Sequence, residues 1–412
     1  MKVLTFGWDY PPVKNGGLGV ACMGLTTELT RLGIEVIFVL PREQEVESNI
    51  RFVFGAIGRA NLREISSPLL PYLSSKTLLY SWNPDGTRRM YAHSLIDEVY
   101  RYAREAALIA EEETFDLIHA HDWTSYLAGL AAKEVSGKPC VLHVHATSFD
   151  QAGGPNVDPE IFAIESRAFS EADGIVTVSD FTKRIIIDKH GVDPKKVTVV
   201  YNGVESFDPA RLPPVLQEWR QQGKKIVLFH GRITLQKGPD YFIRAARRVV
   251  DIDPNVIFII SGWGDMEHEL MDLVAHLGLS SHVKFVGALW GNDRDQMYQS
   301  VDLFVMPSVS EPFGLVALEA IAHGTPVLIS KQSGVSEVLA HALKVDFWDV
   351  EEMANKILAA LRYDSLHRQL RTYGKDEIRS LTWSRAAEKV RELYHRLTTW
   401  YHAQKKPENG EK

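Results

Sequence analysis

The sequence of 412 residues has few cysteines and no long apolar run. The two cysteines, Cys22 and Cys140, lie far apart and form no C-x-x-C pattern, so we expect reduced core residues rather than a disulfide or a zinc site. No stretch approaches about 18 consecutive apolar residues, and the apolar segment at the N-terminus is far shorter than a signal-peptide core. We therefore expect a cytoplasmic protein without a membrane span.

Positive charge is scarce as well. The formal net charge is −7, and the chain contains no long block of Lys and Arg. A nucleic-acid strand is held by clustered basic residues, so the composition argues against a nucleic-acid partner. Apolar residues make up 45% of the chain and charged residues 24%, which is too rich in core-forming side chains for a disordered protein.

Short apolar runs rich in Val, Ile and Phe alternate with longer amphipathic stretches along nearly the whole chain. This pattern is typical of βα units that build parallel sheets, so the sequence predicts an α/β protein. The predicted strands are 2–6, 35–40, 116–120, 139–145, 174–179, 197–201, 225–230, 255–261, 282–286, 302–306 and 325–330. These strands are too many for one ordinary open sheet, and we predict two.

The segment 205–223 contains three prolines and a polar run, which suits a surface connection between domains. We therefore predict a domain 1–205 and a domain 206–382, both Rossmann-like doubly wound parallel sheets, with a ligand cleft bounded by the carboxyl ends of their strands. The final predicted helix, 383–401, carries an apolar stripe that must pack on another element.

A glycine-rich stretch, KNGGLG at 14–19, follows the first predicted strand. Glycines such as Gly16 and Gly17 let the backbone approach a ligand, and the start of the helix that follows favours negative charge. The stretch is a poor dinucleotide fingerprint because Cys22 stands where a third glycine belongs. We interpret it as a phosphate or sugar loop, with a tight turn that binds no ligand as the alternative.

The second half supplies GRITLQKG at 231–238, again directly after a predicted strand. Beyond Gly231, Arg232 offers a planar fork of donors and Lys237 a mobile point charge, a combination suited to a pyrophosphate. The alternative is that both cations are simply solvated.

The segment SEPFGLVALE at 310–319 leads into a helix predicted to end near residue 322. Glu311 precedes the helix and Glu319 places a second carboxylate along it, while Phe313, Gly314 and Leu315 offer backbone N–H groups. Carboxylates accept sugar hydroxyls and N–H groups bind phosphate, so the segment could hold both ends of a nucleotide sugar. Complementing the helix dipole would explain Glu311 but not Glu319.

Four histidines form two pairs, His119 with His121 and His143 with His145, each on one face of a predicted strand. Four imidazoles invite the alternative of a metal-dependent hydrolase that activates water. Such a site normally needs further ligands, and we expect no metal.

Taken together, the chain resembles the retaining glycosyltransferases of the GT-B fold, of the glycogen and starch synthase type and the family 4 group. The resemblance rests on motifs in order along nearly the whole chain: KNGGLG at 14–19, HAHDW at 119–123, HVHA at 143–146, VSDFTK at 178–183, NGV at 202–204, GRITLQKG at 231–238, EPFGLVALE at 311–319 and GTPV at 324–327. It implies a nucleotide-sugar donor bound mainly by the C-terminal domain, a carbohydrate acceptor bound mainly by the N-terminal domain, and no cofactor. It also implies that helix 383–401 crosses back to the first domain.

The resemblance assigns roles to individual residues. Arg232 and Lys237 would neutralise the donor diphosphate, Glu311 would contact the donor sugar, and Glu319 the ribose. His145 would lie beside the transferred sugar. The remaining implied contacts are Gly16, Gly17, Gly231, Phe313, Gly314, Leu315 and Val316 on the donor, and Asp122 and Trp123 near the acceptor.

Acceptor and donor base stay open. Val20 stands where glycogen and starch synthases usually carry an acidic residue, and the region before Ala172 lacks the arginine that holds sugar phosphates in sucrose-phosphate synthases. Arg167 is too close to Ala172, and the other cations available are Lys76, Arg88 and Arg89. We favour transfer of glucose from UDP-, ADP- or GDP-glucose to an α-glucan or small sugar, with a sugar-phosphate acceptor as the alternative. A phosphorylase, an epimerase or a binding-only protein stays open, and no feature indicates an oligomeric state.

Overall fold

The computed structural model describes residues 1–11, 16–41, 50–54, 79–82, 88–92, 94–205 and 213–404. The chain forms two compact units. Unit 1 comprises Met1–Gln151, Asn156–Tyr201 and Trp383–Lys412, and unit 2 comprises Ala152–Pro155 and Asn202–Thr382. No helix among the described residues is long and apolar enough to cross a membrane.

Unit 1 is built on a seven-stranded parallel sheet in the order β3-β2-β1-β6-β7-β8-β9. Its strands are β1 (Lys2–Phe6), β2 (Glu35–Leu40), β3 (Arg51–Phe54), β6 (Leu117–His121), β7 (Cys140–Val144), β8 (Gly174–Thr177) and β9 (Val197–Val199). An antiparallel pair, β4 (Leu79–Trp82) and β5 (Arg88–Ala92), stands apart from this sheet. The strand order reverses between β1 and β6, so the carboxyl ends of these two strands form the switch point where such sheets bind ligands.

Unit 2 repeats the arrangement with a six-stranded parallel sheet in the order β12-β11-β10-β13-β14-β15. Its strands are β10 (Lys225–His230), β11 (Val256–Ser261), β12 (Val283–Gly287), β13 (Leu303–Met306), β14 (Val327–Ser330) and β15 (Leu343–Val345). Here the order reverses between β10 and β13. Both sheets are doubly wound, and the α/β fold class predicted from the sequence is confirmed.

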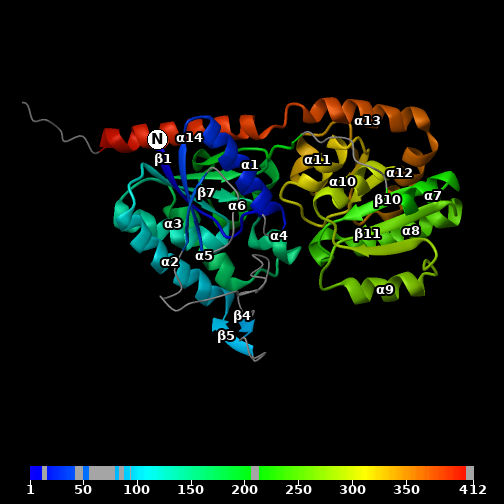
Figure 1. The fold of residues 1–412 in the computed structure, drawn as a ribbon, viewed down its shortest axis with the longest axis horizontal. Helices are drawn as coiled ribbons and strands as arrows, with labels where there is room; N and C mark the ends of the chain where they lie inside the picture. The colour runs from blue at the N-terminus through cyan, green and yellow to red at the C-terminus, as the bar shows by residue number, and fades with distance from the viewer. Residues whose placement is uncertain are drawn as a thin grey trace, which may run out of the picture. The chain divides into compact units, whose positions relative to one another are not determined.

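Helices connect the strands in both units (Figure 1). Those of unit 1 are α1 (Gly17–Arg31), α2 (Leu95–Glu112), α3 (Trp123–Ser136), α4 (Ser148–Ala152), α5 (Pro159–Glu171), α6 (Asp180–His190) and α14 (Trp383–Gln404). Those of unit 2 are α7 (Pro214–Gln221), α8 (Pro239–Ile252), α9 (Glu267–His276), α10 (Gly291–Ser300), α11 (Leu315–Ala322), α12 (Val350–Arg362) and α13 (Asp364–Ile378). Single 3-10 turns occur at Pro194–Lys196, Leu235–Lys237 and Gly334–Glu337.

The described part of the predicted surface connection 205–223 contains a short helix, α7, at Pro214–Gln221, in which Leu216 is buried and the other residues are exposed or half-buried. Pro214 is the first residue of this helix, where its missing N–H costs nothing and its fixed φ favours helix formation. Pro213 and Pro214 therefore lie at the start of a short helix, whereas Pro209 lies outside the described residues.

Helix α14 packs in unit 1, where Figure 1 shows it running past α1. A Cβ atom added at Gly24 of α1 would lie 2.4 Å from the Trp383 ring, and one at Gly174 of β8 would lie 3.0 Å from Leu397. The buried Tyr394 hydroxyl forms a hydrogen bond of 2.6 Å with Nδ1 of His119. The apolar stripe of the last helix is thus used to cover the sheet of unit 1.

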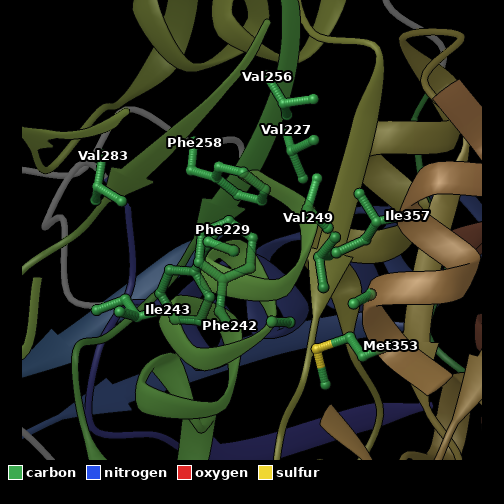
Figure 2. Close-up of a cluster of buried hydrophobic side chains, with 14 of the residues drawn as sticks. Val227, Phe229, Phe242, Ile243, Val249, Val256, Phe258, Val283, Met353 and Ile357 are labelled. Carbon is green, nitrogen blue, oxygen red and sulfur yellow. The ribbon is translucent and has the colours of Figure 1, made fainter. Parts of the chain in front are cut away.

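The core of unit 2 lies between its sheet and helices α8 and α12 (Figure 2). Phe242 and Ile243 of α8 meet Phe229 and Phe258 of the central strands, and the Phe242 and Phe258 rings pack edge to face with centroids 5.4 Å apart. Side chains of this size each contribute about 1.5–3 kcal/mol when fully buried. This core supports β10 and β13, the two strands that end at the switch point.

Candidate functional site

The predicted residues of the second half gather at the switch point of unit 2. Gly231 and Arg232 follow β10, Lys237 closes the turn before α8, and Glu311 lies in the loop between β13 and α11. The Lys237 ammonium lies 2.6 Å from Oε2 of Glu311, and the Ser308 hydroxyl donates to the same oxygen at 3.2 Å. These contacts therefore join the loop after β10 to the loop after β13.

Gln236, which was not singled out from the sequence, also links these two loops. Its side chain is buried, its amide oxygen accepts from Nη2 of Arg232 at 2.8 Å, and its amide nitrogen donates to the Ser310 carbonyl at 3.1 Å. The Val309 N–H donates to the Gln236 carbonyl at 2.9 Å. The only sequence signal for Gln236 was its place between the two cations of GRITLQKG.

Glycines allow the cation loop to lie against its neighbours. A Cβ atom at Gly262 would lie 1.8 Å from the Gly231 carbonyl oxygen, and one at Gly264 would lie 2.1 Å from the Ile233 carbonyl oxygen. Gly238 has a φ of +63°, and its Cβ would lie 2.3 Å from the Pro307 carbonyl oxygen. Any larger residue at these positions would displace the backbone that carries Arg232 and Lys237.

Glu311 precedes helix α11 and is held by neighbouring loops. Helix α11 begins at Leu315, and Glu311 forms a parallel bridge with Ser333 in which its N–H donates to the Gln332 carbonyl. Its carboxylate is fixed by Lys237 and Ser308 rather than by a helix dipole.

The first turn of α11 begins beside Glu311. Gly314 has a φ of +109° and precedes Leu315 and Val316, the first two residues of the helix. The Ala317 N–H donates to the Gly314 carbonyl at 3.0 Å, and the first N–H groups of a helix, here those of Leu315 and Val316, have no acceptor within the helix, which makes this end suited to an anion. The buried Phe313 carries the backbone into this turn, and its carbonyl accepts from Val335 N–H at 2.7 Å.

Glu319 is buried on α11 and has partners that the sequence did not indicate. Its Oε1 accepts from Nη1 of Arg294 at 3.0 Å, and its Oε2 accepts from the Tyr298 hydroxyl at 3.3 Å. Burial raises the pKa of the Glu319 carboxyl, and the Arg294 charge acts against this rise.

The four histidines form one stack at the carboxyl ends of β6 and β7 in unit 1. Neighbouring rings have centroids 4.3 Å apart in both His119–His121 and His143–His145, and His121 pairs with His143 in the strand register. Nδ1 of His121 lies 2.9 Å from Nε2 of His145. Burial lowers the pKa of His119 to about 3 and also lowers the pKa values of His121 and His143, so these three rings are neutral at physiological pH.

Two sets of side chains in this region could offer three ligand atoms to a metal, with atoms within 4.8 Å of one another: His119, His121 and His143, and Cys22, His121 and His145. An ion about 2.0–2.1 Å from each imidazole nitrogen must lie close to every ring plane. The His119 and His143 rings are tilted by only 14° and those of His121 and His143 by 23°, so these planes stack rather than converge. The set of His119, His121 and His143 therefore fits a metal poorly.

Asp122 is buried and serves the backbone of His145. Its Oδ1 accepts from the N–H groups of His145 at 2.6 Å and Ala146 at 3.2 Å, and its own φ is +60°, a left-handed value costly for a residue with a side chain. Burial raises the Asp122 pKa to about 8, although these two hydrogen bonds lower it. Trp123, the first residue of α3, is also buried. The predicted acceptor contacts of Asp122 and Trp123 therefore stay predictions, and the described contacts of Asp122 hold His145.

The glycine loop is described only in part. Lys14 and Asn15 lie outside the described residues, whereas Gly16 has a φ of +122° and Gly17 is the exposed first residue of α1. Cys22 of the same helix lies close to His121 and His145, so the start of α1 and the half-buried His145 belong to one region of unit 1. Both cysteines are free and buried, as predicted.

Two family models match the chain. Residues 15–206 match Glycosyltransferase Family 4, and residues 217–377 match Glycosyl transferases group 1. An uncharacterised glycosyltransferase of Methanocaldococcus jannaschii is 31% identical over 361 residues, which are 83% of this chain and 83% of that protein. The glycogen synthase of Mycobacterium tuberculosis is 28% identical over 371 residues, which are 82% of this chain and 80% of that protein.

Solved structures agree on the fold. Sucrose-phosphate synthase from Thermosynechococcus elongatus matches with a TM-score of 0.73 and 18% identity, and the match covers 97% of this chain and 99% of that chain. At this identity the likeness concerns the architecture alone. Together with the sequence matches and the two doubly wound sheets, it shows that the chain belongs to the GT-B glycosyltransferases of the group 1 and family 4 type.

Proposed function

We propose that this glycosyltransferase transfers glucose from a nucleotide-glucose donor to an α-glucan or a small neutral sugar, with retention of the anomeric configuration. The observation that carries the proposal is the joined pair of loops in unit 2, where Arg232, Lys237 and Glu311 lie at the switch point of the sheet. Two cations beside a carboxylate match a ligand that has a diphosphate next to a polyhydroxylated ring.

In the proposed reaction the acceptor hydroxyl oxygen forms a bond to C1 of the donor sugar while the bond from C1 to the diphosphate oxygen breaks. The acceptor proton passes to that phosphate oxygen on the same face of the sugar. Arg232 and Lys237 stabilise the charge that develops on the leaving group, and Glu311 accepts hydrogen bonds from the sugar hydroxyls. The balance requires no metal and no cofactor.

His145 and the start of α1 belong to unit 1, to which we assign the acceptor. Asp122 holds the backbone of His145, and His121 pairs with its ring, so the imidazole has a defined orientation. The backbone N–H groups at Gly16 and Gly17 would add donors for phosphate oxygens.

A neutral acceptor is favoured by helix α5. The region 160–165, where related enzymes carry an arginine for sugar phosphates, contains no arginine, and its Glu165 is a buried carboxylate that accepts from Ser148 N–H at 2.8 Å. Arg167 on the same helix is paired with Glu171 at 2.8 Å. Lys76 lies outside the described residues, as do the side chains of Arg88 and Arg89.

The test is a matrix of UDP-, ADP- and GDP-glucose against glycogen, glucose, glycerate and fructose 6-phosphate, with nucleotide release and product formation both measured. We expect transfer to glycogen or glucose with one of the three donors. Transfer only to fructose 6-phosphate would replace the neutral acceptor by a sugar phosphate. Activity lost with a chelator and restored by zinc would favour the histidine cluster, and no transfer with any pair would contradict the proposal.

A further inference from the structure

A polar network surrounds Glu319 in unit 2, separate from the pair of Lys237 and Glu311. The Arg294 guanidinium spans two carboxylates, donating from Nη1 to Oε1 of Glu319 at 3.0 Å and from Nε and Nη2 to Oδ1 of Asp295 at 3.0 and 2.9 Å. The Tyr298 hydroxyl donates to the other oxygen of Glu319. Both oxygens of Glu319 are therefore oriented by a donor on α10.

Arg294 and Glu319 lie near the carboxyl edge of the sheet. Helix α10 starts after β12 and carries Arg294 in its first turn, while α11 starts after β13 and carries Glu319 in its second turn. The Glu319 side chain is 12% exposed and that of Arg294 is 19% exposed, so the carboxylate is enclosed but still reached from solvent. Each carboxylate oxygen accepts two hydrogen bonds, so an oxygen that already has one donor can still accept a hydroxyl.

We propose that Arg294 is a positioning residue that holds the Glu319 carboxylate, together with Tyr298, as the acceptor for the two ribose hydroxyls of the donor nucleotide. The inference rests on the proposed nucleotide-glucose donor and on the ribose contact that the family resemblance implies for Glu319. It adds a specific dependence: the preference for ribose over deoxyribose depends on Arg294, a residue that need not touch the ligand.

Charge supports this role. Burial raises the pKa of Glu319, and the Arg294 charge and the Tyr298 hydroxyl both act to keep the carboxylate ionised. Loss of Arg294 would raise this pKa further, so acid would weaken nucleotide binding at a higher pH. The groups around this network are Asp295 and Tyr298 on α10, His323 directly after α11, His230 on β10 and Lys375 on α13.

The nearby histidines would not imitate that effect. Burial lowers the pKa of His230 to about 4 and also lowers that of His323 below its ordinary value. When they do gain protons, the added positive charge would strengthen the binding of an anionic nucleotide. Weaker binding on the acid side therefore has the sign expected for a carboxylate.

The experiment measures by calorimetry the binding of UDP, ADP and GDP and of their 2′-deoxy and 3′-deoxy analogues to the full chain. The variants are Arg294→Gln, Arg294→Lys and Tyr298→Phe, and Arg248→Gln is the matched control. Arg248 forms an exposed ion pair with Glu351 in the same unit, at 2.7 Å. We expect the control to bind like the wild type.

We expect Arg294→Gln to weaken binding of the ribonucleotide roughly tenfold and binding of the deoxy analogues much less, because the lost donor acts through the hydroxyl contacts. Its loss of affinity on the acid side should also begin at higher pH than in the wild type. The affinity of Arg294→Lys for the ribonucleotide should lie between those of the wild type and Arg294→Gln. Tyr298→Phe should also weaken binding of the ribonucleotide more than that of the deoxy analogues, but by less. These two variants keep the test available if Arg294→Gln does not fold.

Two negative results are distinguishable. If the wild type binds one of the nucleotides and the variants leave the ratio of ribose to deoxyribose affinity and the pH profile unchanged, the role of Arg294 is refuted while the proposed function stands. If the wild type binds none of the nucleotides at millimolar concentration, the proposed function fails, and the inference with it.

Discussion

The buried pair of Lys237 and Glu311 yields the most detailed prediction. Their charged atoms lie 2.6 Å apart, and the side chains are 18% and 8% exposed. At an effective dielectric constant of about 20, two charges at this distance attract by about 6 kcal/mol before the cost of desolvation is subtracted. After that cost, a charge-assisted hydrogen bond contributes about 1.5–3 kcal/mol, which is the coupling energy we expect between the two residues.

The two single variants should differ. Lys237→Met leaves the more deeply buried Glu311 without its cation and should lower the free energy of unfolding by about 2–4 kcal/mol. Glu311→Gln keeps an oxygen that Lys237 can approach and should cost only about 1–2 kcal/mol. Binding of the nucleoside diphosphate should weaken in Lys237→Met and persist in Glu311→Gln, because the cation rather than the carboxylate is assigned to the phosphates.

The assay is urea unfolding of the wild type, both single variants and the double variant, with Lys331→Met as control. Lys331 pairs with Asp346 at 2.8 Å in the same unit, but these side chains are 53% and 30% exposed. An exposed pair contributes about 0–1 kcal/mol, so the control should change little. A coupling energy below about 0.5 kcal/mol between Lys237 and Glu311 would refute the reasoning.

Three further predictions concern the framework of the two units. Tyr394→Phe removes the buried hydrogen bond to His119 and should lower the free energy of unfolding in urea by about 1–1.5 kcal/mol, and no change would contradict that contact. Gly238→Ala should destabilise the protein more than Gly33→Ala. Both glycines have positive φ, but a Cβ atom at Gly238 would meet a carbonyl oxygen at 2.3 Å, whereas nothing lies within 4 Å of one at Gly33. Thermal unfolding of both variants checks this, and equal losses of stability would contradict it. The pKa of Asp122 is raised from 3.8 to about 8, so the stability that its protonated form contributes is fully present below pH 3.8 and is lost as pH rises through 8. Relative to Asp122→Asn, the free energy of unfolding of the wild type in urea should fall by up to about 1.4 kcal/mol per pH unit between pH 5 and 8. A difference that stays constant with pH would contradict the raised pKa.

Much of the fold could be predicted because parallel strands in doubly wound sheets are buried on both faces. The apolar runs at Lys2–Phe6, Glu35–Leu40 and Lys225–His230 were predicted with the bounds that the structure shows. Strands β3 and β15 were missed, and so was the antiparallel pair of β4 and β5. Strands β3 and β15 are short edge strands whose pattern is weak. Edge strands depend on pairing with a neighbour, which a local pattern does not contain.

The residues of the candidate site could be predicted where a single sequence motif carries several polar or charged groups. Lys237 and Glu311 lie 74 positions apart, yet both follow strands that turn out to be neighbours, so the fold brings their side chains together. Arg294 could not be found this way, because it lies in a polar helix with no motif. Its role depends on the packing of α10 against α11, which only the structure shows.

The most direct test of the account is the anomeric configuration of the transfer product. An α-linked nucleotide-glucose donor is incubated with the preferred neutral acceptor in the presence of a metal chelator, and the new linkage is followed by proton NMR. We predict an α-linked product and an undiminished rate. A β-linked product would contradict retention, and a rate abolished by the chelator would contradict a reaction driven by Arg232, Lys237 and Glu311 without a metal.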